Sequence, residues 1–285
     1  MSPNQTPDRT APAPLAAAEV GSLTGRLYED GIIGLPQAFP RDWVRQLGED
    51  IDTAFAEARA RPGGAVGRGP NRFYVEVHPE QLRGFADLAG HPWITAVAEA
   101  VLGPEYRIVE VGFDVPLAGA VDQPWHRDFP MPEETARDRK LTSLAVNVTA
   151  VDTEPDMGPF EIAPGTHWDD GDAFEHGMFP PRETYPRYRS LAVRKFPRMG
   201  DISIRSALTL HRGTANHSAK SRPVLVLGLD APGAGNDERH DTAVTREYWA
   251  SLPESVRAHL HCPVVEALEP ITQKHTIEGL VMGES

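Results

Sequence analysis

The segment 123–130, QPWHRDFP, places an imidazole and a carboxylate two positions apart, at His126 and Asp128. In an extended chain, side chains at i and i+2 leave the same face of the backbone, about 7 Å apart. Both groups are common metal ligands, so the pair predicts two ligands of a single metal ion. The same pattern recurs at 167–169, and a triplet this short also arises by chance. The interpretation therefore needs a third ligand elsewhere in the chain.

A third ligand is available at His211, which follows the strand-like run 201–210. If His211 ends that strand, it can face His126 and Asp128 across a barrel. Two His and one carboxylate occupy one face of an octahedron and leave positions open, as in non-haem Fe(II) oxygenases. His217 is the alternative distal ligand, and a hydrogen-bonded surface pair is the alternative for the triplet itself.

Arg222 begins the next strand-like run, eleven positions after His211. The planar fork of arginine suits a carboxylate better than the point charge of lysine does. We therefore expect Arg222 to anchor a dicarboxylate co-substrate whose other end chelates the iron. An ordinary surface position is the alternative, but the apolar run 224–227 that follows favours a place at the rim of the site.

The composition limits the classes of partner. The 285-residue chain has a net charge of −13, which argues against nucleic acid or an anionic membrane as a partner, because both need clustered Lys and Arg. A single cysteine, Cys262, excludes an intramolecular disulfide and a thiolate metal cluster. A metal must therefore use His, Asp or Glu, and the low cysteine content suits a reducing cytoplasm.

We expect no targeting signal in this sequence. No basic segment followed by an apolar run opens the sequence, and no stretch approaches eighteen consecutive apolar residues. We expect a cytoplasmic protein with a small-molecule substrate and no membrane partner, present as a monomer or homodimer. Residues 1–15, rich in Pro, Thr and Ala, are expected to be a disordered tail. Residues 16–285 are expected to form a single catalytic domain.

The elements that must position these residues change in type along the chain. Residues 16–104 are predicted to be mainly helical, with helical runs at 15–30, 40–61, 79–88 and 92–102 and short strands at 32–36 and 71–77. Residues 105–230 contain strand-like runs at 106–115, 141–151, 159–163, 191–196, 201–211 and 224–230. Residues 231–285 return to helix and end in a tail. This order predicts an α+β chain whose strands form a sandwich or barrel.

The segment 168–189 is longer than most structural connections. Loops of that length often cover a site, so the segment is a candidate lid. Disorder is the alternative.

Four motifs, in order, resemble the phytanoyl-CoA dioxygenase family. They are PWHRD at 124–128, GPFEIAPGTH at 158–167, GD at 200–201 and HRGTANHSAKSR at 211–222. The resemblance extends over residues 32–230. It implies a double-stranded β-helix, or jelly roll, at 105–230, with the N-terminal helices packed on its outside. It also explains the second triplet, because Pro164 to His167 matches the family's turn at the end of a strand.

The resemblance implies that His126, Asp128 and His211 are the metal ligands. Asn216 and Arg222 then match the family's asparagine and its 2-oxoglutarate arginine, five and eleven positions after the distal histidine.

The pocket for 2-oxoglutarate departs from the family pattern. Many relatives have a bulky aromatic or a hydroxyl residue where this chain has Asn147 and Gly213. Thr209, Asn147 and Ser218 are therefore candidates for contacts with 2-oxoglutarate beyond Arg222.

The resemblance implies a non-haem iron dioxygenase that uses Fe(II), 2-oxoglutarate and O2, with ascorbate as a stimulant. The expected reaction is hydroxylation, or a related C–H oxidation, of a small molecule in natural-product metabolism. Asp128 leaves no position vacant for chloride, which implies an oxygenase rather than a halogenase. The alternatives are an acyl-CoA hydroxylase, a jelly-roll module that binds metal or ligand without catalysis, and a cupin-like isomerase.

Overall fold

Two antiparallel sheets of unequal size form the centre of the protein, whose computed structural model describes residues 15–274. The larger sheet has the strand order β1-β8-β5-β10-β4-β3-β2, the smaller has the order β7-β6-β9, and β11 and β12 form a parallel pair. The strands are β1 (Ile32–Leu35), β2 (Val66–Gly67), β3 (Arg72–Glu76), β4 (Arg107–Pro116), β5 (Ser143–Thr149), β6 (Phe160–Ile162), β7 (Val193–Arg194), β8 (Ile202–Ser206), β9 (His211–Gly213), β10 (Val224–Asp230), β11 (Val244–Thr245) and β12 (Val264–Val265).

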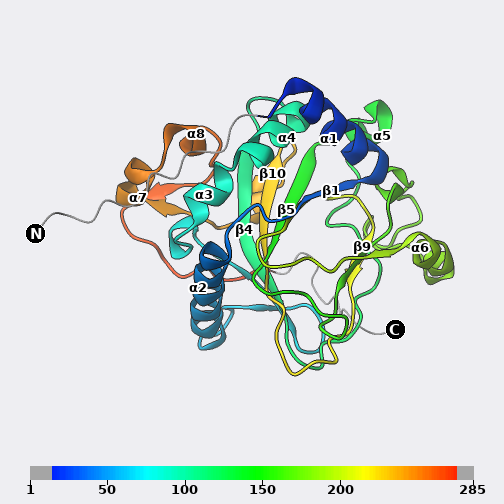
Figure 1. Ribbon diagram of the computed structural model, residues 1–285, viewed down its shortest axis with the longest axis horizontal. Coiled ribbons are helices and arrows are strands. Elements are labelled where there is room, and N and C mark those ends of the chain that lie inside the picture. The colour runs from blue at the N-terminus through cyan, green and yellow to red at the C-terminus, as the bar shows by residue number, and fades with distance from the viewer. Residues whose placement is uncertain (1–14, 275–285) are drawn as a thin grey trace, which may run out of the picture.

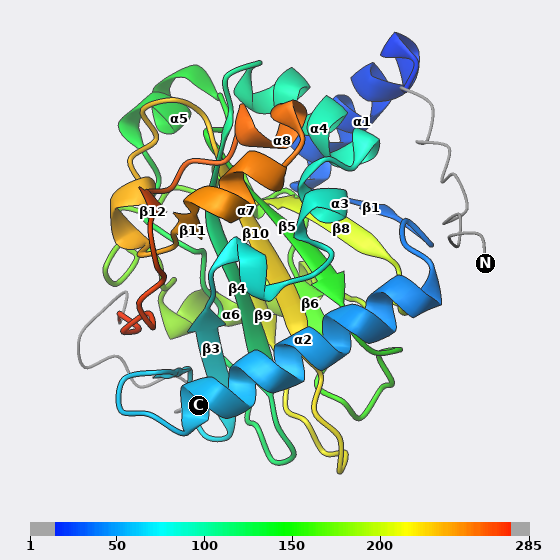
Figure 2. The same ribbon diagram turned by 90° about the vertical axis from the view of Figure 1, so that its left-hand side faces the viewer.

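Helices cover one face of the large sheet, and the small sheet lies on the other side. Figure 1 shows α2, α3 and α4 on one side of β4, β10 and β5, with β9 and α6 on the opposite side. In the turned view, α2, α3 and α7 lie in front of the large sheet, and α6 lies behind it (Figure 2). The helices are α1 (Ala17–Asp30), α2 (Arg41–Arg59), α3 (Phe85–Ala89), α4 (Pro92–Leu102), α5 (Glu133–Asp138), α6 (Tyr185–Leu191), α7 (Arg246–Ser251) and α8 (Glu254–Arg257).

Alternation along the strands gives the large sheet two chemically different faces. On β5, Val146 and Val148 are buried in the main hydrophobic core beneath the helices, whereas Ala145 and Asn147 line a cavity on the inner face. Each large apolar side chain buried in this way stabilises the fold by about 1.5–3 kcal/mol relative to an exposed one. The apolar face therefore holds the sheet in place while the polar face remains free for chemistry.

The expected elements are confirmed at most positions. Strands 106–115, 141–151, 159–163 and 224–230 correspond to β4, β5, β6 and β10, and the helical runs 15–30 and 92–102 correspond to α1 and α4. The run 79–88 is divided between a 3-10 turn, η1 (Pro79–Gln81), and α3. Residues 1–14 of the expected tail lie outside the described part of the chain. Between residues 15 and 274, no helix is both long and apolar enough to cross a membrane.

The expectation of one continuous strand at 201–211 is wrong. The run contains two strands, β8 in the large sheet and β9 in the small sheet, with a turn at 207–210 between them. His211 therefore begins a strand instead of ending one. The break allows the chain to cross from one sheet to the other, which a single straight strand could not do.

Gly31 caps the C-terminus of α1, and this residue also contacts the crossing between the sheets. Gly31 adopts a left-handed conformation (φ 75°), which glycine accepts without a steric penalty. Its carbonyl accepts hydrogen bonds from the Ser206 amide at 2.9 Å and from Thr209 Oγ1 at 3.0 Å. Because a Cβ at Gly31 would overlap Thr209 Oγ1 and His167 Nδ1, the site also lacks room for a side chain.

We predict that Gly31→Ala destabilises the protein by about 2 kcal/mol or more, from left-handed strain and overpacking together. Gly25→Ala is the matched control, because Gly25 lies within α1 and a methyl group added there would meet open space. Alanine there is expected to stabilise the helix by up to about 1 kcal/mol. Urea unfolding measures the free energy of unfolding of both variants and of the unaltered protein. Equal unfolding midpoints for Gly31→Ala and Gly25→Ala would contradict the role assigned to Gly31.

Candidate active site

His126 and His211 are brought together by backbone pairing. The His126 amide donates to the His211 carbonyl at 3.0 Å, and the His211 amide donates to the His126 carbonyl at 2.9 Å. His126 thereby extends the small sheet by one residue beside β9. The Asp128 amide donates to the Ala207 carbonyl at 2.9 Å, and the chain bends at residue 128, so the expected extended geometry of 126–128 is not kept and these residues belong to no strand of either sheet.

The side chains of His126, Asp128 and His211 form a cluster that could hold a metal ion. One ligand atom from each residue lies within 4.8 Å of the others. Nδ1 of His126 lies 2.9 Å from the Pro124 carbonyl, and Nδ1 of His211 lies 2.8 Å from the Thr209 carbonyl. A carbonyl only accepts, so each Nδ1 carries its proton and each Nε2 presents a lone pair, as a metal ligand requires.

The protonation states also suit a metal site. Burial and the neighbouring His211 lower the pKa of His126 to about 3, and burial lowers the pKa of His211. Burial alone would raise the pKa of Asp128, but Arg205 and His211 outweigh it and hold that pKa well below its usual value. At neutral pH the cluster therefore offers two neutral imidazoles and one carboxylate.

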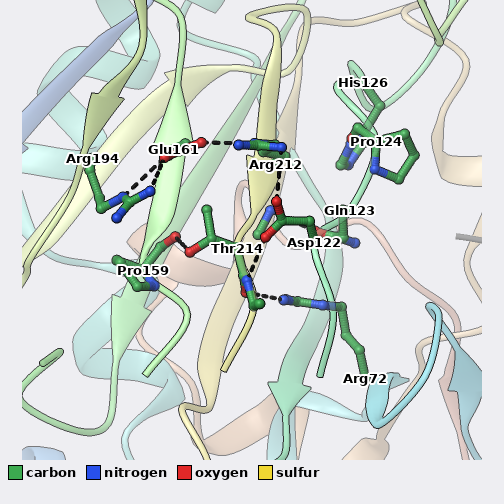
Figure 3. Close-up of polar contacts among 12 residues, drawn as sticks. Arg72, Asp122, Gln123, Pro124, His126, Pro159, Glu161, Arg194, Arg212 and Thr214 are labelled. Carbon is green, nitrogen blue, oxygen red and sulfur yellow. Dashed lines mark hydrogen bonds and ion pairs between the residues drawn. The ribbon is translucent and has the colours of Figure 1, made fainter. Parts of the chain in front are cut away.

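An ion-pair network fixes the segment that leads to His126. Glu161 on β6 accepts from Arg194 on β7 and from Arg212 on β9, the latter at 2.8 Å (Figure 3). Arg212 also pairs with Asp122 at 3.1 Å, and Asp122 accepts from the Ala215 amide at 2.7 Å. The network joins the three strands of the small sheet to the chain just before His126 and Asp128.

Gln123 reinforces the same alignment. Its amide donates to the Gly213 carbonyl at 2.9 Å, and its side-chain Oε1 accepts from the Gly213 amide at 2.8 Å. Residues 122–126 are thereby held in register with β9, which fixes His126 opposite His211.

The cluster lies in a cavity of about 1090 Å³ on the inner face of the large sheet. The polar residues of this face come from β3, β4, β5 and β8 and from the loop that precedes β10, and they line the same cavity as the two histidines and Asp128. They include Arg72, Tyr74, Glu76, Glu110, Asp114, Asn147, Thr149, Ser203, Arg205 and Arg222.

Arg222 lies in this cavity beside a second arginine. Arg222 is 3% exposed and donates through Nε to the Met157 carbonyl at 3.2 Å. Burial lowers its pKa to about 10, with a further contribution from Arg72 and an opposing one from Asp114. Arg72 donates to Asp114 at 2.8 Å and to the Thr214 carbonyl at 3.1 Å, the latter contact drawn in Figure 3. The two guanidinium groups and one carboxylate leave a net positive charge at this end of the cavity.

Gly213 makes room for Arg72. A Cβ at Gly213 would overlap the Arg72 guanidinium. The departure from the family pattern at Gly213 thus coincides with a bulky cation supplied from β3, on the opposite side of the cavity.

The remaining predicted residues are divided between the cavity and the turns. Asn147 lines the cavity, whereas Thr209 and Ser218 are not among its lining residues. The Thr209 hydroxyl donates to the Gly31 carbonyl, and the Ser218 hydroxyl donates to Asn216 Oδ1 at 2.7 Å. Both hydroxyls therefore stabilise turns near the site.

Asn216 and His217 have different surroundings from the metal-binding cluster. Asn216 donates to the carbonyls of Pro116 and Lys220, which fixes the loop that leads to Arg222. His217 is exposed and lies outside the cluster formed by His126, Asp128 and His211.

The candidate lid at 168–189 is ordered for part of its length by a 3-10 turn, η3 (Arg182–Thr184), and the start of α6. Buried Tyr188 packs against Trp125, with 6.1 Å between ring centroids. Arg127 donates to the Asp169 carbonyl at 3.1 Å and lies over the Phe174 ring. The segment therefore packs against residues 125–127, next to the candidate metal site, and its opening as a lid stays a prediction.

Arg72 and Arg205, two buried cations of the cavity, were not predicted from the sequence. The sequence nevertheless contains a pattern that places both arginines on the inner face. In RFYVE at 72–76 and ISIRS at 202–206, charged and polar residues alternate with apolar ones, which places them on the inner face. Alternation identifies the face, but it does not identify the group that each arginine contacts.

Several solved structures are similar to this chain, and among them are enzymes described as dependent on alpha ketoglutarate, another name for 2-oxoglutarate. The carbocyclase SnoK from nogalamycin biosynthesis is 20% identical, with a TM-score of 0.60 over 80% of this chain and 92% of SnoK. EctD from S. alaskensis with bound Fe is also 20% identical, with a TM-score of 0.58 over 80% of this chain and 79% of EctD. The epimerase SnoN, in complex with Fe3+, alpha ketoglutarate and nogalamycin RO, is 22% identical, with a TM-score of 0.56 over 77% of this chain and 93% of SnoN.

These likenesses define the fold, and the family follows from the sequence itself. The family model of phytanoyl-CoA dioxygenase matches residues 27–224. The chain belongs to the phytanoyl-CoA dioxygenase family and is a non-haem iron, 2-oxoglutarate-dependent enzyme.

We predict that His211→Ala lowers affinity for Fe(II) by at least about 10-fold, because one of three ligands is lost. His217→Ala is the matched control, and it should retain the affinity of the unaltered protein because its side chain is exposed outside the cluster. Anaerobic calorimetry measures the Fe(II) affinity of both variants and of the unaltered protein. The reverse result would assign the distal ligand to His217.

Proposed function

We propose that the protein is an oxygenase that oxidises a C–H bond of a small molecule, with hydroxylation as the expected outcome. The observation that carries the proposal is the gathering of His126, Asp128 and His211 on the wall of a cavity that also contains the guanidinium of Arg222. A metal centre and an anion anchor in one cavity are what a chelating dicarboxylate co-substrate requires.

His126, Asp128 and His211 fit iron as its proposed ligands. Both imidazoles present Nε2 with the proton held on Nδ1, and the carboxylate is ionised. Iron bound there would activate O2 and couple the oxidative decarboxylation of 2-oxoglutarate, which gives succinate and CO2, to oxidation of the substrate. Ascorbate is expected to stimulate turnover.

Arg222 is proposed to bind the distal carboxylate of 2-oxoglutarate, with Arg72 beside it. The pairing of Arg72 with Asp114 and the Thr214 carbonyl holds its guanidinium in place before the co-substrate arrives. Asn147, on the inner face of β5, is a further candidate contact. Arg72 is thus proposed as a contact with 2-oxoglutarate, in addition to the sequence candidates Thr209 and Ser218.

The fold supports the same proposal. We infer that the large and small sheets are the two sheets of a double-stranded β-helix, within a single catalytic domain at residues 16–285. The cavity of about 1090 Å³ exceeds the volume of 2-oxoglutarate and leaves space for a small-molecule substrate. The similarity to a carbocyclase and an epimerase of nogalamycin biosynthesis favours a natural-product intermediate as that substrate.

A turnover assay tests the function. Incubation with Fe(II), ascorbate and 2-oxoglutarate under air is expected to yield succinate, at a rate that rises when the correct substrate is present. Omission of Fe(II), or addition of a chelator, should abolish succinate formation. Absence of turnover under all conditions, together with absence of metal binding by calorimetry, would refute the enzymatic function.

Arg222→Ala is predicted to raise the KM for 2-oxoglutarate roughly 10- to 100-fold, the loss expected for a hydrogen bond between charged groups. Affinity for Fe(II) should change far less, because Arg222 is not one of the metal-binding residues. Lys220→Ala is the control, since it removes an exposed cation from the same loop. Equal effects on KM and on iron affinity would show that Arg222 acts only through the fold.

A further inference from the structure

Arg205 makes a two-point contact with the carboxylate of the metal-binding cluster. Its Nη1 donates to Asp128 Oδ2 at 2.6 Å, and its Nη2 donates to Asp128 Oδ1 at 3.2 Å. Arg205 projects from β8, where it is 5% exposed. The contact therefore joins the large sheet to the segment that carries His126 and Asp128.

The two oxygens of Asp128 are not equivalent. Oδ1 lies 3.4 Å from His211 Nε2 and has the longer of the two contacts with Arg205. Oδ2 has the shorter contact, and 2.6 Å is a short distance for a charge-assisted hydrogen bond between nitrogen and oxygen. Oδ1 is thus the oxygen that faces His211, and Oδ2 is the oxygen held more closely by the guanidinium.

The surroundings of Arg205 keep its guanidinium in this position. Its neighbours in register are Ala145 on β5 and Ile32 on β1, and the small side chain of Ala145 leaves the inner face open beside it. The guanidinium lies 5.9 Å from the centre of the Phe160 ring, on the small sheet. The side chain is therefore confined between the two sheets while its fork points at Asp128.

We propose that Arg205 is a positioning residue that restricts Asp128 to one metal-bound oxygen. The inference rests on the proposed function, because it takes the cluster of His126, Asp128 and His211 as the metal site. With Oδ2 engaged by Arg205, Asp128 contributes Oδ1 alone, and three of six octahedral positions stay open. 2-Oxoglutarate needs two of these positions and O2 needs the third. A carboxylate free to bind through both oxygens would close the position that O2 needs.

Metal affinity alone is a poor test of this role. Loss of the guanidinium removes a positive charge that repels the metal ion, but it also releases the carboxylate from its orientation. These two effects on affinity oppose one another. The number of water molecules on the metal reports the coordination of Asp128 directly.

The experiment uses the full-length protein loaded with Mn(II) alone. Electron paramagnetic resonance spectra are recorded in ¹⁷O-enriched water, and the broadening of the Mn(II) lines gives the number of water molecules bound to the metal. The unaltered protein is expected to hold three waters. Arg205→Met and Arg205→Gln are expected to hold two, because Oδ2 then joins the metal. Arg205→Lys, which keeps a cationic donor, is expected to restore three. Adding 2-oxoglutarate should then lower the count by two in each protein.

Arg187→Met is the matched control. Arg187 also makes a two-point pair with an aspartate, Asp169, but its side chain is 53% exposed and the pair lies outside the metal cluster. This variant should hold three waters. Circular dichroism establishes that each variant is folded, and Arg205→Gln serves if Arg205→Met does not fold.

Three waters in both folded Arg205 variants would overturn the inference and reduce Arg205 to a structural ion pair. Two waters in these variants and three in the control would support it. Failure of the unaltered protein to bind Mn(II) or Fe(II) would instead refute the metal site and the proposed function with it. The two failures are therefore distinguishable.

Discussion

The paired backbone hydrogen bonds between His126 and His211 are the interaction on which the site depends. They join two segments that are 85 positions apart in the sequence and place two imidazoles with their ring centroids 4.4 Å apart. Backbone pairing of this kind is insensitive to side-chain identity, so it fixes position without using the groups that do the chemistry. The ion pairs of Glu161 and Asp122, together with Gln123, then prevent the pairing from slipping by a residue.

Buried charge is the main energetic difficulty of this cavity, and compensation by neighbouring groups resolves it. Asp128 pairs with Arg205, and Arg72 pairs with Asp114, so two cations and two anions are matched around the cavity. Arg222 donates through Nε to a neutral acceptor, the Met157 carbonyl, and burial lowers its pKa. A buried guanidinium is costly without an anionic partner and is stabilised by an arriving carboxylate. Because its guanidinium is buried and donates to a neutral carbonyl, Arg222 is suited to bind the carboxylate of a co-substrate.

Much of the candidate site could be predicted from the sequence because its residues lie at fixed spacings within short motifs. The spacing of His126 and Asp128, the position of His211 and the interval to Arg222 all lie within short motifs. The contacts of Arg72 and Arg205 could not be predicted, because they depend on strand register across the sheet. Thr209 is a candidate contact with 2-oxoglutarate from the sequence, and the structure adds that its hydroxyl, in the turn at 207–210, donates to the Gly31 carbonyl.

The sequence by itself determined the family, the alternation that gives the large sheet one apolar and one polar face, and the residues suited to bind a metal. These follow from residue type and from periodicity, which are local properties. Only the tertiary structure decided that residues 201–211 cross between two sheets, that Arg205 holds Asp128, and that Arg72 lies beside Arg222. These features depend on which distant segments pair, and hydrogen bonding between segments far apart in the chain leaves no pattern in either segment alone.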